Sequence, residues 1–212
     1  MPVTMATREE TLDVARDTEF PTMAEDEFVE WCNKDTRAEF TDGRIVFMSP
    51  VSIDHSLTFN WLTRVLGLFV EHRGLGVVLG SEVMLRLRPG LRRLPDLIFV
   101  AEERRGILRQ NHIEGAPDAV FEIVSPDSVS RDWREKFAEY AEAGVSEYWV
   151  IDSPHQRADL NVLDEGGRYE SVEEDDGYLI SQAIEGFRLK TEWLWEEPLP
   201  NPLDVLRELG GP

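Results

Sequence analysis

Two apolar runs, Pro95-Asp96-Leu97-Ile98-Phe99-Val100 and Ala119-Val120-Phe121-Glu122-Ile123-Val124, decide the fold and point to its chemistry. Each run predicts a strand. The second is nearly continuous in apolar residues, which is typical of a central strand covered on both faces. Asp96 stands at the start of one strand and Glu122 in the middle of the other. Because an ionised carboxylate in a buried strand is unfavourable unless it is compensated, Glu122 indicates a metal or catalytic site.

A lysine further along the chain is a candidate partner for these carboxylates. Lys136 lies in a segment that predicts an amphipathic helix over Val129–Ala143, stopped by Gly144. It falls at the border of the apolar stripe, so it could reach over the sheet towards Glu122. It could instead form an exposed pair with Asp132, one turn earlier. Two carboxylates and a lysine brought together would make a divalent-metal site suited to phosphodiester hydrolysis.

Most of the candidate residues also have a purely structural interpretation. Taken alone, Asp96 is more simply a turn or cap residue, and Glu122 could belong to a structural salt bridge. Glu39 is a further candidate for the site, because it lies in a predicted hairpin strand, where a carboxylate is a poor strand former. His55 opens a long helix, and a lone histidine there is more often a capping or core residue than a ligand. The sequence has no phosphate-binding glycine loop and no Gly-x-Ser-x-Gly elbow.

Working outward from the two runs, the sequence predicts an α/β domain over residues 22–212, after a loose arm over residues 1–21. We expect a mixed central β-sheet flanked by helices, with a C-terminal antiparallel β-meander. The N-terminal part predicts a helix over Met23–Asn33 with a capping box of Thr22 and Glu25, a hairpin of Arg37–Thr41 and Arg44–Met48 around Asp42-Gly43, and a helix over Asp54–His72. The middle part predicts strands Val77–Leu79, Val83–Arg88 and Asp96–Val100 with a Pro89-Gly90 turn between the last two, an irregular or short helical crossover over 101–117, and strands Asp118–Val124 and Glu147–Ile151. The C-terminal part predicts the meander strands Ala158–Leu163, Arg168–Val172, Tyr178–Ile180 and Phe187–Lys190, and a helix over Pro202–Leu209.

The composition is that of a soluble globular protein. The chain has 212 residues, of which 42% are hydrophobic and 30% charged, enough for one domain with a full core. The single cysteine, Cys32, excludes an internal disulfide and a cysteine-rich zinc site. No signal pattern or membrane-spanning stretch is evident, so we expect a cytoplasmic protein.

The net charge of −20 is unfavourable for binding nucleic acid, but it is unevenly distributed. Residues 31–110 hold twelve basic and nine acidic residues, and their arginines concentrate between residues 86 and 109. These arginines are candidates for phosphate contacts, or they neutralise the acidic remainder of the surface. The sequence leaves both interpretations open.

Several motifs together resemble the Uma-two family of endonucleases, within the restriction-endonuclease-like PD-(D/E)XK superfamily. The resemblance covers roughly residues 22–195 and is most specific from Glu122 to Asp152. It is carried by Glu39–Gly43, Ser49-Pro50, His55, Pro95-Asp96, Glu114–Asp118, Phe121–Ser128, Arg131-Asp132, Lys136, Tyr140 and Gly144–Asp152.

The resemblance implies a restriction-endonuclease-like core with a Mg²⁺ site, for which Mn²⁺ would substitute. Asp96 and Glu122 would be metal ligands, with the backbone carbonyl of Ile123 as a third. In the superfamily's ancestral motif a lysine lies two residues after the glutamate, where this chain has Val124. The resemblance therefore implies that Lys136 supplies the displaced ammonium group.

The functional hypothesis is a metal-dependent endonuclease acting on DNA. Glu39 would join Asp96, Glu122 and Lys136 as a catalytic residue, and the candidate substrate contacts are His55, Arg86 and Arg88. Cutting both strands of a duplex needs two sites, so we expect a homodimer. The alternatives are a catalytically inactive nuclease fold serving as a dimeric nucleic-acid-binding or interaction scaffold, and hydrolysis of a different phosphate ester.

Overall fold

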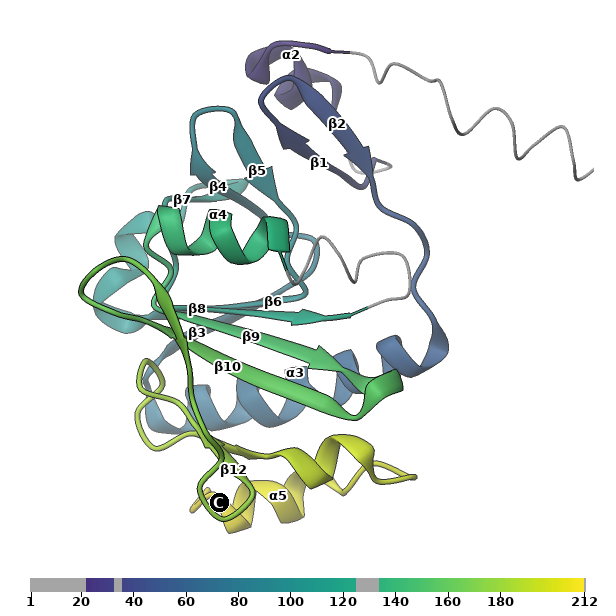
Figure 1. Cartoon of the computed structure of the whole chain (residues 1–212), viewed down its shortest axis with the longest axis vertical. Coiled ribbons are helices and arrows are strands. Elements are labelled where there is room, and N and C mark those ends of the chain that lie inside the picture. The colour runs from purple at the N-terminus through teal and green to yellow at the C-terminus, as the bar shows by residue number, and fades with distance from the viewer. Residues whose placement is uncertain (1–21, 33–35, 125–133, 212) are drawn as a thin grey trace, which may run out of the picture.

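The computed structural model describes residues 22–32, 36–124 and 134–211 (Figure 1). The helices are α2 (Glu25–Trp31), α3 (Ile53–Arg73), α4 (Lys136–Ala143) and α5 (Pro202–Glu208), with short 3-10 helices η1 (Glu102–Ile107), η3 (Ser153–His155) and η4 (Thr191–Trp195). The strands are β1 (Ala38–Thr41), β2 (Arg44–Phe47), β3 (Gly76–Gly80), β4 (Met84–Arg88), β5 (Leu91–Arg93), β6 (Leu97–Ala101), β7 (His112–Glu114), β8 (Ala119–Ile123), β9 (Glu147–Asp152), β10 (Arg157–Leu163), β11 (Tyr169–Ser171), β12 (Tyr178–Ile180) and β13 (Arg188–Lys190).

These strands form two mixed sheets and one antiparallel pair among the described residues, so the predicted mixed α/β class is confirmed. The larger sheet has six strands in the order β11-β10-β9-β8-β6-β3, and the smaller has five in the order β2-β1-β5-β4-β7. Strands β12 and β13 form the separate pair. The run from Ala119 is a central strand, as predicted, because β8 pairs parallel with β9 and antiparallel with β6.

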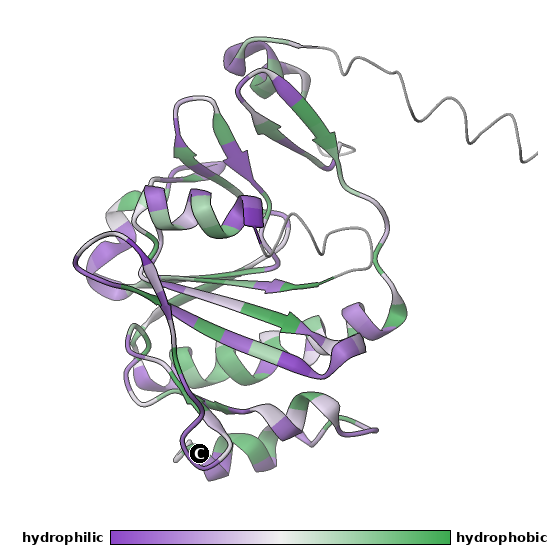
Figure 2. Cartoon of the chain, viewed as in Figure 1, coloured by the Kyte–Doolittle hydropathy of each residue, from purple (hydrophilic) through white to green (hydrophobic). Residues whose placement is uncertain are grey.

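The alternation of side chains along β8 determines which layer each residue faces. Phe121 and Ile123 join the apolar cluster that contains the buried face of α3, whereas Val120 and Val124 join the cluster that contains Tyr140 of α4. Figure 1 shows α3 and α4 on opposite sides of the larger sheet, and Figure 2 shows the hydrophobic stretches of α3 and the strands beside it. Because side chains alternate with a period of two, Glu122 faces α4.

The smaller sheet carries the N-terminal part of the domain. The hairpin of β1 and β2 turns at Asp42-Gly43, as predicted, and both turn residues have positive φ angles, 45° and 93°. Helix α2 packs on this sheet through Phe28, whose ring stacks on Phe40 with centroids 5.0 Å apart. Strand β1 pairs with β5, which brings Glu39 and Arg93 into neighbouring strands.

Three predictions in the first half of the chain are wrong in detail. The Pro89-Gly90 turn does not connect directly to the Asp96 strand, because a further strand, β5, returns beside β4. Strand β5 has the sequence Leu-Arg-Arg, which carries no apolar periodicity to reveal it. The crossover over 101–117 contains strand β7 in addition to η1, and β7 pairs parallel with β4.

The third error is the cap of α2. The N-cap is Ala24, whose backbone N–H donates to Glu27 at 3.0 Å, and Glu25 instead binds arginines of the smaller sheet.

One prediction in the second half of the chain also differs. The expected meander divides, because β10 and β11 extend the larger sheet as antiparallel strands, whereas β12 and β13 form a separate antiparallel pair. The helix predicted over Val129–Ala143 corresponds to α4, which ends at Ala143 and is capped by Gly144 in the left-handed region, as predicted. The predicted start at Val129 lies outside the described residues. Asp132, the alternative partner of Lys136, lies outside the described residues. No helix among the described residues is long and apolar enough to cross a membrane.

Candidate active site

The centre of the candidate site is an ion pair between β8 and the first residue of α4. Lys136 Nζ lies 2.8 Å from Glu122 Oε1, and the two side chains are 2% and 4% exposed. Tyr140 follows Lys136 by one helical turn, so both face the sheet, and its hydroxyl donates to the same Glu122 oxygen at 2.8 Å. The side chain of Lys136 therefore spans the gap between helix and strand.

A second buried ion pair adjoins the first and links the smaller sheet to α4. Glu39 of β1 is fully buried and accepts from Arg93 Nη1 at 2.9 Å and from the backbone N–H of Leu94 at 3.1 Å. The same guanidinium donates through Nε and Nη2 to both oxygens of Glu139, at 2.8 and 2.6 Å. Lys136 Nζ lies 3.8 Å from Glu39 Oε1, which joins the two pairs into one network.

Asp96 approaches the site from the other neighbour of β8. The β6–β8 ladder ends at the pairing of Leu97 with Phe121, and just beyond it Asp96 Oδ2 accepts the N–H of Ile123 at 2.8 Å. The carboxylate thus continues the hydrogen bonding of the sheet and lies beside the main chain next to Glu122. Asp96 Oδ1 lies 3.2 Å from His55 Nε2, at the start of α3.

Burial and charge set the protonation of two groups in this network. Burial raises the pKa of Tyr140 well above its usual range, and the nearby Glu122 carboxylate raises it further. Tyr140 therefore remains a hydrogen-bond donor at neutral pH. Burial alone would lower the pKa of Arg93, but the carboxylates of Glu39 and Glu139 more than offset this, so the pKa is raised overall and Arg93 stays charged.

A family model described as "Uma2: Putative restriction endonuclease" matches residues 25–192, which is most of the chain and includes every residue of this network. The chain belongs to the Uma2 family. A solved structure described as "a putative nuclease belonging to DUF820 from Anabaena variabilis" shares the fold, with a TM-score of 0.68. The two are 18% identical, over 82% of this chain and 97% of that chain. A search of curated proteins found no match.

Five of the residues singled out from the sequence form two sets of contacts. Glu39, Glu122 and Lys136 share one network, and Asp96 contacts His55 and the backbone of Ile123.

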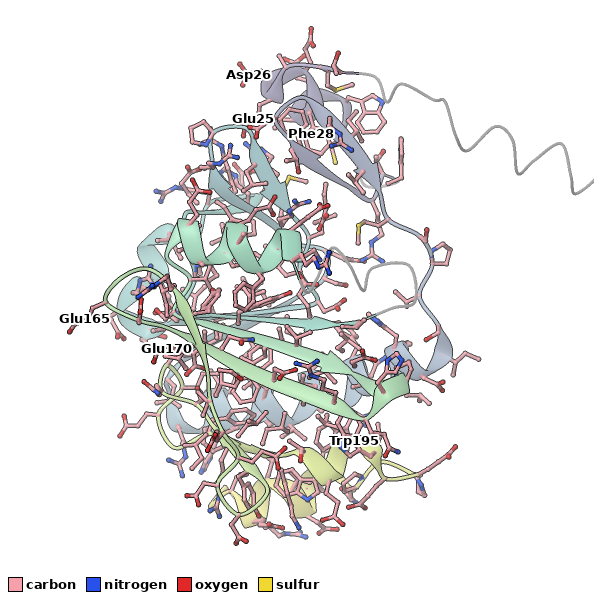
Figure 3. All side chains as sticks on the ribbon, viewed as in Figure 1. Glu25, Asp26, Phe28, Glu165, Glu170 and Trp195 are labelled. Carbon is pink, nitrogen blue, oxygen red and sulfur yellow. The ribbon has the colours of Figure 1, made fainter. Side chains whose placement is uncertain are left out.

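The other two candidates, Arg86 and Arg88, are bound to acidic residues elsewhere. Arg86 pairs with Glu25 and Glu114, and Arg88 pairs with Asp42. Figure 3 shows Glu25 on α2, towards the N-terminal end of the domain. These contacts favour the interpretation in which the arginines neutralise acidic neighbours.

Three residues of the network were not singled out as site residues from the sequence. Arg93 appeared only as one of several arginines, because strand β5 itself was not predicted. Tyr140 could have been found from its spacing, because it lies four residues after Lys136 and so faces the same side of the helix. Glu139 gives no comparable signal, since an acidic residue on an amphipathic helix is ordinarily exposed.

Proposed function

We propose that this protein is a metal-dependent endonuclease that hydrolyses DNA phosphodiester bonds, with Asp96 and Glu122 as the ligands of Mg²⁺. The observation that carries the proposal is the 2.8 Å contact between Lys136 and Glu122, made across fourteen residues of sequence inside a buried site. A lysine beside one of two neighbouring carboxylates is the combination that the superfamily motif calls for. Family membership supports a nuclease.

The charges and donor atoms of the site suit a divalent cation. Three carboxylates, Glu39, Glu122 and Glu139, contact two cations, Arg93 and Lys136. With the carboxylate of Asp96, which contacts the backbone of Ile123, these side chains carry two formal negative charges in total. No group of three or more His, Cys, Asp or Glu side chains in the described ranges could hold a metal. Mg²⁺ does not need such a group, because it commonly binds one or two carboxylates and keeps water and phosphate oxygens as its other ligands. The backbone carbonyl of Ile123 would be a further ligand.

Each side chain then has a distinct role. A bound Mg²⁺ would polarise the scissile phosphate and lower the pKa of a bound water. Lys136 would orient that water or stabilise the negative charge that develops on the phosphate. Tyr140 holds the Glu122 carboxylate in place, and His55 does the same for Asp96. The carboxylate of Glu39 neutralises the charges of Arg93 and Lys136. The family resemblance also allows a second role, in which Glu39 binds a second metal or the attacking water.

Nicking of supercoiled plasmid DNA tests the proposal. We expect cleavage that requires Mg²⁺ or Mn²⁺ and that falls by about 100-fold or more in Asp96→Asn and in Glu122→Gln. Glu170→Gln is the control, because Glu170 is an exposed glutamate on β11, at the far edge of the same sheet. Full activity in both site variants would contradict the proposal.

Mn²⁺ titration by calorimetry separates an enzyme from a scaffold. The proposal expects one Mn²⁺ site in the wild-type protein that is lost in Asp96→Asn. A protein that binds DNA without binding Mn²⁺ at this site would instead be the inactive nuclease-fold module.

A further inference from the structure

The ammonium group of Lys136 has two carboxylates within reach. Glu122 Oε1 is the nearer, at 2.8 Å, and Glu39 Oε1 lies 3.8 Å away. Both carboxylates are buried, so each attracts the cation more strongly than an exposed group would. A displacement of about 1 Å would exchange the closer partner. Something must therefore bias Lys136 towards Glu122.

Arg93 is placed to supply that bias. It is 1% exposed, and its Nη1 donates to Glu39 Oε2, the oxygen opposite the one that Lys136 approaches. This contact gives Glu39 a cation of its own and weakens its attraction for Lys136.

Arg93 also fixes the position of α4. Its Nε and Nη2 form a two-pronged contact with Glu139, three residues after Lys136 on the same helix. The Arg93 guanidinium therefore neutralises the competing carboxylate, Glu39, and also fixes the distance of α4 from the smaller sheet.

We infer that Arg93 is a positioning residue that keeps the ammonium group of Lys136 next to Glu122 and away from Glu39. This inference rests on the proposed function for its catalytic consequence, but its structural content stands separately. Lysine at position 93 would keep one positive charge, yet it lacks the planar fork that binds Glu39 and Glu139 together. Without Arg93, Glu39 competes for Lys136, and the ammonium group moves away from Glu122.

NMR of the lysine ammonium groups tests the structural part directly. The chain contains three lysines, Lys34, Lys136 and Lys190, so the ¹⁵N-ammonium spectrum is simple, and Lys136→Gln assigns the signal of interest. Lys136 is buried and ion-paired, so its ammonium protons should exchange slowly with water in the wild-type protein. We expect this signal to shift or broaden in Arg93→Lys and in Arg93→Met.

Two further variants give the experiment its control and its rescue. Arg92→Met removes a buried arginine from the same strand, but Arg92 pairs with Glu25 on α2, so the Lys136 signal should not move. Adding Glu39→Gln to Arg93→Met removes the competing charge, so the Lys136 signal should return towards its wild-type position. The double variant also removes a buried carboxylate that Arg93→Met leaves without its guanidinium partner, which guards against misfolding.

Single-turnover cleavage tests the catalytic consequence in the same variants. With DNA and Mn²⁺ saturating, we expect the cleavage rate of folded Arg93→Lys to fall by about 100-fold, because a 1 Å misplacement has an effect of that size. The affinity for DNA should be unchanged. A role in stability alone would lower the melting temperature without lowering this rate.

The outcomes distinguish the inference from the proposed function. A wild-type Lys136 signal that exchanges rapidly, or one that is identical in Arg93→Lys, would overturn the role of Arg93. A shifted signal in a protein whose wild type cleaves no DNA would support the role of Arg93 and reject the nuclease. A shifted signal with an unchanged cleavage rate would overturn the catalytic part of the inference.

Discussion

Replacing Lys136 by methionine tests how much the ion pair between Lys136 and Glu122, which joins α4 to the larger sheet, contributes to the free energy of unfolding. With an effective dielectric constant of about 20, unit charges at the 2.8 Å separation of Lys136 and Glu122 attract by about 6 kcal/mol, and at the 3.8 Å separation from Glu39 by about 4 kcal/mol. Desolvation of the charges offsets much of this attraction. Removing one partner of a buried pair therefore destabilises a fold by about 3–5 kcal/mol.

Urea denaturation at pH 7 measures this change in the free energy of unfolding. A double-mutant cycle with Glu122→Gln isolates the pairwise part, since Lys136→Met in the Glu122→Gln background leaves no carboxylate unpaired at position 122. We expect a coupling energy of about 2 kcal/mol or more. The exposed pair of Arg207 and Asp204, 65% and 68% exposed, is the control, and its coupling should be below about 1 kcal/mol.

A small effect would refute this reasoning. If Lys136→Met lowers the free energy of unfolding by no more than the exposed control pair does, Lys136 is not held between two buried carboxylates. The assigned partner would then be wrong, and with it the geometry on which the proposed function depends.

Four further predictions concern the fold. The hydrogen bond from Arg86 holds the pKa of Glu25 at about 2, below its ordinary 4.5, so its stabilising effect is present above pH 4.5 and is lost as the pH falls towards 2. The difference in melting temperature between the wild type and Glu25→Gln should close over that range. Glu147→Ala should lower the free energy of unfolding by about 3 kcal/mol or more in urea, because buried donors lose their acceptor. Gly76→Ala should be more disruptive still, by about 4 kcal/mol or more, since its Cβ would lie 2.2 Å from a carbonyl oxygen of β6 at a φ of 152°. Gly67→Ala, with open space in α3, should instead stabilise by about 0.5–1 kcal/mol in the same assay.

The elements predicted well from sequence are those whose residues carry a period or a turn signal. Helix α3 has a long apolar stripe and ends at Gly74 in the left-handed region, so its predicted bounds are close to the observed Ile53–Arg73. Strand β5 has three residues, two of them arginines, and its buried state depends on ion pairs with α2, β1 and α4. No local pattern records such distant partners, so this strand could not be predicted from its own residues.

The same distinction applies to the candidate site. Asp96 and Glu122 could be singled out locally, because each carboxylate adjoins or interrupts an apolar run. Arg93 could not, since its role comes from the pairing of β5 with β1 and from the packing of α4. The predicted position of Lys136, at the edge of an apolar stripe, underestimated its burial of 98%. Side-chain length explains this difference, because a lysine stem can cross apolar surface to reach a carboxylate.

The placement of the lysine on a helix follows from the surroundings of Val124. This residue lies two positions after Glu122, just beyond the end of β8, and packs in the apolar cluster that contains Tyr140. A lysine at this position would bring an ammonium group into a space that valine and its neighbours fill. Lys136 approaches the same face from α4 and delivers its ammonium group to Glu122 directly. The chain can therefore keep an apolar side chain at position 124 while Glu122 still has a cation beside it. Because that cation, Lys136, comes from α4, the geometry of the site depends on how firmly α4 is packed against the sheet.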